Sequence, residues 1–442
     1  MSRFIKTYRA SWLPLMATLL WAGSIVSGAE AQTDIYVRGS GRLIPVALPQ
    51  LCLESGTTEA ATKIPAVMAR DLDLSGYFQV IDPGSYIETP GRCPGPDGFS
   101  YSDWSVIGAD GLVRGTVQVV GELIRVRMYL YDVPRRQMVL GKEYEGDATQ
   151  ISRMGHRFAN EVMKFFTGQY GPFGSQIVYS SRVGRFKELF IMDMDGSNMQ
   201  RLTNERGLAL SPSWDSSGAN VVYISYRSRM PDLFLLDVMR RSTRQISRGE
   251  GLEIGAKFLG NGTFLTSRSS GRDSDIVIMG RDGNVIRKMS APPGTINVSP
   301  SLAPDGQRFA FCSNRAGGPQ IYVSDLSGGP AQRISFVNAN YCTSPAWSPK
   351  ADRIAFVCRS DGGFQIYAVD ANGSNALQLT SGGDNEDPDW SPDGRYLAFA
   401  TTFGKRGGPF HIAMMREDGS NVKQLSDGRS GDFEPSWGPV VP

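Results

Sequence analysis

The sequence predicts two domains, an N-terminal α/β domain followed by a six-bladed β-propeller that the C-terminal strand closes. Three observations predict this fold. A short phrase around an anchor residue recurs through the second half of the chain, the anchors keep an almost constant spacing, and the two ends of the repeat array complete each other. The anchors, 44, 44, 45, 43 and 47 residues apart, are Trp214, Phe258, Leu302, Trp347, Trp390 and Trp437.

Each repeat predicts four short strands. A turn of the Ser-Pro-Asp-Gly kind follows the anchor, because proline presets the first dihedral of a type I turn and glycine closes it. Two apolar strands come next, for example residues 395–400 in one repeat and 365–369 in another. An Asp-Gly or Asn-Gly turn then leads to a last strand that ends in Leu-Thr or a related pair. Four strands in about 45 residues are typical of a propeller blade.

The ends of the array predict the number of blades. The last anchor, Trp437, has no strands after it, and the first blade-like strands, residues 177–180 and 189–192, have no anchor before them. The C-terminal strand is therefore expected to join the strands of residues 176–203. This pairing would close six blades over residues 175–442 and remove an exposed sheet edge.

Residues 1–31 have the features of a signal peptide. Arg3, Lys6 and Arg9 precede an apolar run over residues 12–26, and the sequence Ala-Glu-Ala at 29–31 fits a cleavage site. The alternative is an uncleaved membrane anchor, which the shortness of the apolar run disfavours. No other stretch reaches eighteen apolar residues, so the mature chain is expected to be an exported, soluble protein without a membrane span.

Residues 32–168 predict the α/β domain, and residues 169–174 form a glycine-rich linker to the propeller. Helical periodicity appears over residues 57–74 and 148–166, and an antiparallel run of strands over residues 112–144. His156 falls opposite the apolar stripe of the second helix, so it is expected on the solvated surface.

The five cysteines can form disulfides in an exported chain. Cys342 and Cys358 flank a predicted hairpin at a separation that suits a disulfide between adjacent strands. Cys52 and Cys93 both lie in the N-terminal region and could pair. Cys312 would then remain free, as a small buried apolar residue.

Composition and motifs argue against catalysis and nucleic-acid binding. The chain has 46 basic and 44 acidic residues, so it offers no excess of positive charge for phosphates. Its two histidines, His156 and His411, leave little for a zinc site or a Ser-His-Asp triad, and no Gly-x-Ser-x-Gly motif is present. The Asp-Gly turns lack the spacing of a calcium loop. We expect no catalytic residue, metal or cofactor; the alternative is an exported propeller hydrolase or lyase.

Several segments resemble a known family. They are GTVQVVGELIRVRMYLYDV at 115–133, GQYGPFGSQIVYSSR at 168–182, and the blade phrases SPDGR and DGSN-x-x-QL. Together they resemble the TolB family, periplasmic propeller proteins of the Tol-Pal system in Gram-negative bacteria, over essentially the whole mature chain. The resemblance implies a non-catalytic protein that binds the peptidoglycan-associated lipoprotein Pal through the propeller and TolA through the mature N-terminus. Other Tol-Pal and outer-membrane proteins are further candidate partners. It also implies roles in outer-membrane integrity and in envelope constriction at cell division.

The first residues of the mature chain are a candidate partner site. Residues 32–42 precede the first predicted element and contain Gly-Ser-Gly, which favours a mobile arm. The segment Asp34, Ile35, Tyr36, Val37 and Arg38 alternates polar and apolar residues, so it could add as a strand to the sheet edge of a partner. In the resembling family this stretch contacts TolA. The alternative is a first strand of the α/β domain itself.

Four acidic residues are the second candidate site. Glu386, Asp387, Asp432 and Glu434 stand at or near the starts of inner strands, so we expect them around the mouth of the propeller channel. The chain enters the ring beside the Ser-Pro-Asp-Gly turns, which leaves the opposite face open to the main partner. Converging carboxylates there would favour a basic partner segment or a bound cation. The alternative is a solvated acidic rim that has no partner.

Overall fold

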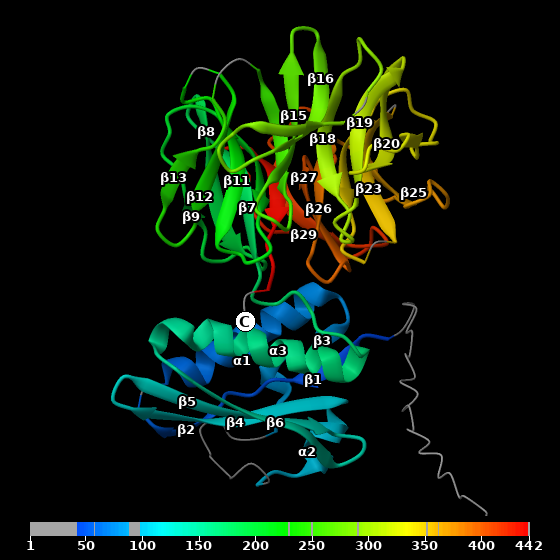
Figure 1. Ribbon diagram of the computed structural model, residues 1–442. Helices are drawn as coiled ribbons and strands as arrows, with labels where there is room; N and C mark the ends of the chain where they lie inside the picture. Colours follow the sequence, from blue (N-terminus) through cyan, green and yellow to red (C-terminus); the bar gives the residue numbers. More distant parts are fainter. Residues whose placement is uncertain are drawn as a thin grey trace, which may run out of the picture. The chain divides into compact units, whose positions relative to one another are not determined.

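The computed structural model describes residues 42–440 except 57, 88–97, 229, 249–250, 290, 351 and 361. In this part of the chain a mixed sheet with three α-helices is followed by six four-stranded sheets (Figure 1). An α/β domain and a six-bladed propeller are thus confirmed. The expected signal peptide and residues 32–41 lie outside the described residues. None of the helices in the described part combines the length and apolar character that crossing a bilayer requires.

The α/β domain is built on a sheet in the order β3-β1-β4-β5-β6, with β2 also pairing β4. β1 is parallel to both of its neighbours, whereas β5 and β6 extend the sheet antiparallel. The elements are β1 (Ile44–Ala47), β2 (Cys52–Ser55), α1 (Glu59–Ser75), β3 (Phe78–Val80), η1 (Pro83–Ser85), α2 (Tyr101–Val106), β4 (Gly111–Val120), β5 (Leu123–Asp132), β6 (Gln137–Gly146), η2 (Ala148–Gln150) and α3 (Ile151–Thr167).

Alternation along β4 and β5 determines what each face of this sheet packs against. Val117 and Val126 belong to the large core that also holds the buried residues of α1 and α3. On the opposite face, Leu112 and Tyr131 pack around Trp104 of α2. The sheet is therefore covered by the two long helices on one face and in part by α2 on the other.

His156 is not on the solvated surface, so that prediction was wrong. Its Nδ1 atom lies 2.7 Å from Oδ2 of Asp71, and both side chains are buried where α3 packs against α1. Burial raises the pKa of Asp71 to about 6. Burial also acts to lower the pKa of His156, but the hydrogen bond and the charge of Asp71 outweigh it and raise that pKa above its ordinary value. The apolar stripe of α3 predicted only the face that packs on the sheet. It did not reveal that a second face, which carries His156, packs against α1.

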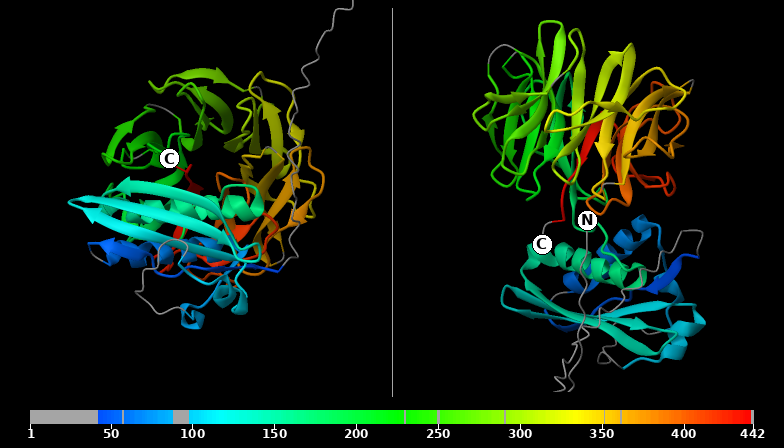
Figure 2. Two further views of the ribbon diagram at one scale, coloured as in Figure 1. Left: turned by 90° about the horizontal axis from the view of Figure 1, so that it is seen from below. Right: turned by 45° about the vertical axis from the view of Figure 1, so that its right-hand side comes forward.

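The propeller consists of six blades, which surround a central axis (Figure 2). Blades 1 to 5 follow chain order, and blade 6 combines the last strand with the first three. The strands are β10 (Ala209–Trp214), β11 (Asn220–Ser225), β12 (Asp232–Asp237) and β13 (Ser242–Gln245) in blade 1; β14 (Glu253–Phe258), β15 (Phe264–Ser270), β16 (Asp273–Met279) and β17 (Val285–Lys288) in blade 2; β18 (Asn297–Leu302), β19 (Arg308–Ala316), β20 (Gly318–Asp325) and β21 (Gln332–Arg333) in blade 3; β22 (Cys342–Trp347), β23 (Arg353–Ser360), β24 (Gly363–Asp370) and β25 (Leu377–Gln378) in blade 4; β26 (Asn385–Trp390), β27 (Tyr396–Thr401), β28 (His411–Arg416) and β29 (Lys423–Gln424) in blade 5; and β30 (Asp432–Trp437), β7 (Gln176–Val183), β8 (Phe186–Asp193) and β9 (Gln200–Arg201) in blade 6.

Blade 6 joins the two ends of the propeller sequence. Its strand order is β30-β7-β8-β9, and Trp437 lies opposite Ile177 in the antiparallel ladder. The indole N–H of Trp437 also donates to Oγ of Ser175, 2.8 Å away, where the chain enters the ring. Backbone pairing and the side chain of Trp437 thus both connect the C-terminal strand to the start of the propeller.

The recurring Leu-Thr phrase has a structural explanation. The hydroxyl of its second residue accepts a hydrogen bond from a backbone N–H of the third strand in the same blade, at 2.8–2.9 Å. The five observed pairs are Thr203 with Leu189, Ser247 with Leu233, Ser335 with Ile321, Thr380 with Ile366, and Ser426 with Ile412. These groups are buried, so each hydroxyl satisfies a backbone donor that would otherwise lack a partner. The hydroxyl of Thr380 also donates to Oε1 of Gln365, at 3.0 Å.

The cysteine predictions can be compared directly with the structure. Cys342 and Cys358 are joined by a disulfide and lie opposite each other in β22 and β23, and Cys312 is free and buried, so both predictions are confirmed. Cys52 is disulfide-bonded as well. Its proposed partner, Cys93, lies outside the described residues.

Turns at one end of the propeller contact the α/β domain. The hydroxyl of Tyr396 donates to the carbonyl of Ser75 at 3.0 Å, and Arg70 forms an ion pair of 2.8 Å with Asp195 in the first Asp-Gly turn. Asn421, in another such turn, donates to the carbonyl of Leu74 at 3.0 Å. The end that carries the Asp-Gly and Ser-Pro-Asp-Gly turns therefore faces the α/β domain.

The buried hydroxyl at the end of blade 4 should be needed for stability. Replacing Thr380 with valine keeps the shape but leaves the N–H of Ile366 without its partner, so we expect a loss of about 1–3 kcal/mol in the free energy of unfolding. Urea denaturation measures this loss, with Ser381→Ala at the exposed neighbouring residue as the control. Equal stability of the two variants would contradict this role of the Leu-Thr phrase.

Candidate functional site

The open end of the propeller, here called the loop face, consists of two sets of loops. One set joins each blade to the next, and the other joins the second and third strands within a blade. Backbone hydrogen bonds connect the two sets, for example from the N–H of Arg182 to the carbonyl of Gly431 at 3.1 Å and from that of Arg359 to Tyr341 at 2.9 Å. The loop face lies opposite the turns that meet the α/β domain.

Every inner strand has one residue with a left-handed backbone at the same position near the loop face. The φ angles of these residues lie between 49° and 65°, and the residues are Ser211, Gly255, Ser299, Ser344, Asp387 and Glu434. In each strand the pairing register shifts around this residue, as in a β-bulge. Five of the six are not glycine, and such conformations concentrate at functional sites. The bulge turns the side chain out of the normal alternation of the strand.

The left-handed residues of neighbouring blades meet around the axis. Glu434 of blade 6 accepts hydrogen bonds from the N–H and Oγ of Ser211 in blade 1, at 3.0 and 3.2 Å. Asp387 of blade 5 accepts one from Oγ of Ser344 in blade 4, at 3.2 Å. These carboxylates therefore belong to a ring at the channel mouth, which the Ser residues of two other blades help to hold.

Three carboxylates at the mouth lie close enough to influence one another. Burial raises the pKa of Asp387 to about 7, and the negative charges of Glu434 and Glu386 add to the effect. Burial and the charge of Asp384 raise the pKa of Glu386 as well. The protonated form of Asp387 is consequently favoured over that of an ordinary aspartate. A positively charged group placed here would remove the mutual repulsion and would favour the fully ionised cluster.

Asp432, the fourth residue expected at the mouth, lies elsewhere. Asp432 is the first residue of β30. In every inner strand the first residue is buried within the propeller and does not face the channel. All six are less than 5% exposed: Ala209, Glu253, Asn297, Cys342, Asn385 and Asp432. Asp432 instead lines a cavity of about 280 Å³ beside Arg182 and Asp427. In a regular strand residues 432 and 434 would face the same side. The bulge at Glu434 gives them different orientations, and the sequence pattern did not reveal it.

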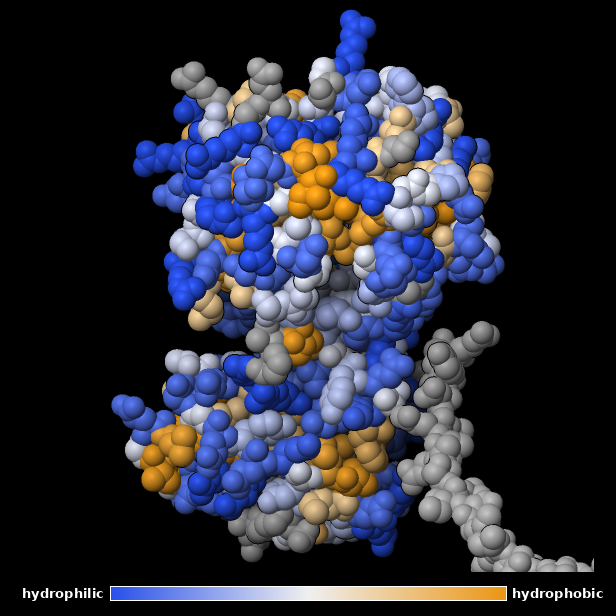
Figure 3. Space-filling view, in the orientation of Figure 1, coloured by the Kyte–Doolittle hydropathy of each residue, from blue (hydrophilic) through white to orange (hydrophobic). Residues whose placement is uncertain are grey.

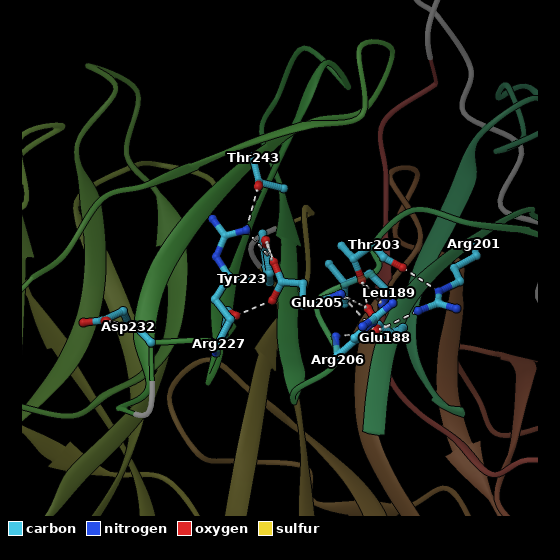
Figure 4. Close-up of polar contacts among 12 residues, drawn as sticks. Glu188, Leu189, Arg201, Thr203, Glu205, Arg206, Tyr223, Arg227, Asp232 and Thr243 are labelled. Atoms are coloured by element: carbon cyan, nitrogen blue, oxygen red, sulfur yellow. Dashed lines mark hydrogen bonds and ion pairs between the residues drawn. The ribbon is translucent and has the colours of Figure 1, made fainter. Parts of the chain in front are cut away.

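Buried polar networks hold the loops of blades 6 and 1 in place (Figure 4). The carboxylate of Glu188 accepts the N–H groups of Glu205 and Arg206 at 3.0–3.1 Å and forms an ion pair with Arg201 at 2.8 Å. Glu205 in turn accepts a hydrogen bond from the hydroxyl of Tyr223. Since these acidic groups already have partners, they stabilise the loop face and are not available to a ligand.

Large apolar side chains are exposed on the loop face, and the sequence analysis missed them. Their exposed fractions range from 39% to 66%, and the residues are Tyr226, Met230, Ile296, Phe336, Tyr341 and Phe403. Aromatic residues and methionine are enriched in protein–protein interfaces. The signal was present in the sequence, since all six lie in the loops that follow from the blade pattern.

The other end of the channel is a cavity of about 910 Å³, lined by all six anchor residues. Two of the anchors also connect blades, because the indole N–H of Trp214 donates to the carbonyl of Ser436 and that of Trp390 donates to Ala346, at 3.2 and 3.0 Å. The recurring anchors are therefore explained by packing and blade contacts. Within the described residues, no cluster of three or more His, Cys, Asp or Glu side chains could hold a metal ion. The candidate N-terminal residues Asp34–Arg38 lie outside the described part of the chain.

Comparison with known proteins places the chain in one family. Residues 163–441 match the TolB beta propeller domain, and residues 10–139 match the TolB amino-terminal domain. A Tol-Pal system protein TolB of Syntrophotalea carbinolica is 38% identical over 202 residues, which is 45% of this chain and 47% of that protein. A TolB homolog of Chlorobium luteolum is 32% identical over 67% of each chain, and the Tol-Pal system protein TolB of Bordetella pertussis is 29% identical over 99% of this chain and 97% of that protein.

A solved structure agrees with the fold. The crystal structure of TolB from Acinetobacter baumannii superimposes with a TM-score of 0.77 at 24% identity, covering 90% of this chain and 97% of that one. The propeller match alone covers more than half of the sequence. This chain belongs to the TolB family of the Tol-Pal system.

Proposed function

We propose that this protein is a non-catalytic adaptor in the periplasm. It binds the lipoprotein Pal through the loop face of the propeller and TolA through its mature N-terminus. The observation that supports the first contact is the acidic channel mouth at the centre of a face with exposed aromatic side chains, on the end of the propeller opposite the α/β domain. Through these partners the protein maintains outer-membrane integrity and supports envelope constriction at cell division.

Two features support a periplasmic location. The sequence begins with a predicted signal peptide, and Cys342 and Cys358 form a disulfide, a bond that persists in oxidising compartments. Membership of the TolB family agrees with both. No specific observation favours the alternative of an exported propeller hydrolase or lyase.

The N-terminal arm is proposed as the TolA site because its alternating residues could add as a strand to the sheet edge of a partner. Within the described residues, β1 is already paired with β3 on one side and β4 on the other. The alternating residues Asp34–Arg38 would remain available to pair with a strand of the partner.

The acidic mouth should be required for Pal binding. Replacing Glu386, Asp387 and Glu434 together with their amides keeps the shape of the side chains and removes the charges. We expect Pal to bind more than tenfold more weakly, since losing a buried charge contact costs about 2–5 kcal/mol. Calorimetric titration measures the affinity, and Glu122→Gln at an exposed turn of the α/β domain is the control. A correctly folded triple variant that binds Pal with unchanged affinity would place the docking site elsewhere.

Pal binding should also depend on pH through Asp387. Its pKa is raised to about 7 in the free protein, and a basic partner group would lower it, so binding releases a proton. Affinity should therefore increase as the pH rises from 6 to 8, by about tenfold for one such group. The same titrations on the Asp387→Asn variant are the control, because they show the pH dependence that comes from ionisable groups of the partner. An equally steep pH dependence in that variant would rule out Asp387 as the titrating group.

Deleting Gln32–Arg38 from the mature protein should abolish TolA binding and leave Pal binding intact. The physical reason is that the arm supplies the strand that TolA binds, whereas the propeller supplies the Pal site. Pull-down with each purified partner checks both halves of this expectation. If the truncated protein retained TolA, the arm would not be the site; if it lost folding stability in urea, residues 32–38 would be part of the α/β domain instead.

A further inference from the structure

Exposed basic side chains lie around the acidic mouth on the loop face, on every blade except blade 3. On these loops and the adjoining strand ends, the described residues include ten exposed basic side chains and one exposed acidic side chain, Asp427. The ten, here called the basic rim, are Arg182, Arg185, Arg206, Arg227, Arg248, Arg272, Arg359, Lys405, Arg406 and Arg429. The edge of the propeller that the loop face forms is accordingly hydrophilic over much of its length in Figure 3.

The basic rim does not follow from the overall composition. The whole chain carries a net charge of only +2, so the excess is local to one face. Nor does the fold use most of these charges. Arg227 pairs with Glu205 and Arg429 with Asp427, but among the described residues the other eight have no ion-pair partner. Like charges gathered on one face repel one another, and an anionic partner would relieve this repulsion.

We infer that the partner of the loop face is a protein with two zones of charge, a basic segment that enters the channel mouth and an acidic surface around it that faces the basic rim. This inference rests on the proposed function and adds the charge pattern of the partner. The inner zone is set by Glu386, Asp387 and Glu434. Asp387 and Glu434 are left-handed residues that accept hydrogen bonds from Ser344 and Ser211 of neighbouring blades, and Glu386 precedes Asp387 in β26. The outer zone is set by the basic rim.

A protein complements this pattern better than an anionic membrane does. A uniformly negative bilayer would attract the rim but would be repelled by the carboxylates at the centre. The loop face also carries exposed aromatic side chains, such as Phe336 at 66% and Phe403 at 42%, alongside the arginines of the basic rim. Arginine and aromatic residues together are typical of protein–protein interfaces.

The two zones should affect different steps of binding. Exposed charges at the periphery mainly steer the approach of a partner, so they change the association rate, and this change is screened by salt. Charges enclosed at the centre mainly change the dissociation rate. The basic rim can thus be distinguished from the mouth by kinetics.

The experiment compares two charge reversals of the same size in the full mature protein. One reverses three rim residues, R182E/R248E/R272E, and the matched control reverses three exposed residues outside the loop face, R240E/R241E/R287E. Association with the soluble domain of Pal is measured by stopped-flow at 25 and 150 mM NaCl. We expect the rim variant to associate at least tenfold more slowly than the control at low salt, with a smaller difference at high salt. Circular dichroism confirms that both variants are folded.

Three other outcomes of this experiment would contradict the inference, each in a different way. If both variants associate at the same rate while the wild type binds Pal, the two-zone inference is wrong and the proposed function stands. If the wild type does not bind Pal at all, the proposed function fails and this inference fails with it. If the wild type binds vesicles of anionic phospholipid, and only the rim variant loses that binding, the rim is a membrane site and not a protein site.

Discussion

The pairing of β30 with β7 is the interaction on which the rest of the propeller depends. It joins strands that lie more than 250 residues apart in the sequence into one ladder, with Trp437 opposite Ile177. Without it, the array would have two exposed sheet edges and an open channel. The same strand carries Glu434, which reaches across to Ser211 of blade 1. The strand that closes the ring therefore also forms one side of the channel mouth.

The bulge in each inner strand links this architecture to the chemistry of the open face. A regular strand would direct alternate residues into the blade interior, where the first residue of each inner strand is buried. The left-handed residue interrupts that alternation and brings Asp387 and Glu434 towards the axis. Burial, together with the negative charges of Glu434 and Glu386, raises the pKa of Asp387. The carboxylates at the mouth thus repel one another and would be stabilised by a cation. This is a property expected of a binding site.

The sequence predicted the architecture well because propeller repeats have a strong local signal. The anchors, the turns and the Leu-Thr phrases recur with a fixed period, and each corresponds to a contact within or between blades. It predicted single side chains less well. Asp432 was placed wrongly because a bulge cannot be read from alternation, and His156 because helical periodicity shows one buried face and α3 has two. The exposed aromatic and basic residues were not recognised because their arrangement on one face appears only when all twelve loops are brought together.

The most direct test of this account is the footprint of the partner on the protein. Hydrogen–deuterium exchange, measured on the mature chain with and without Pal, should show protection in the loops of the loop face, including residues 203–208 and 426–431, and in the inner strands that carry the left-handed residues. The turns that contact the α/β domain should be unchanged. Protection confined to those turns, or to the outer strands of the blades, would contradict the assignment of the loop face as the docking surface.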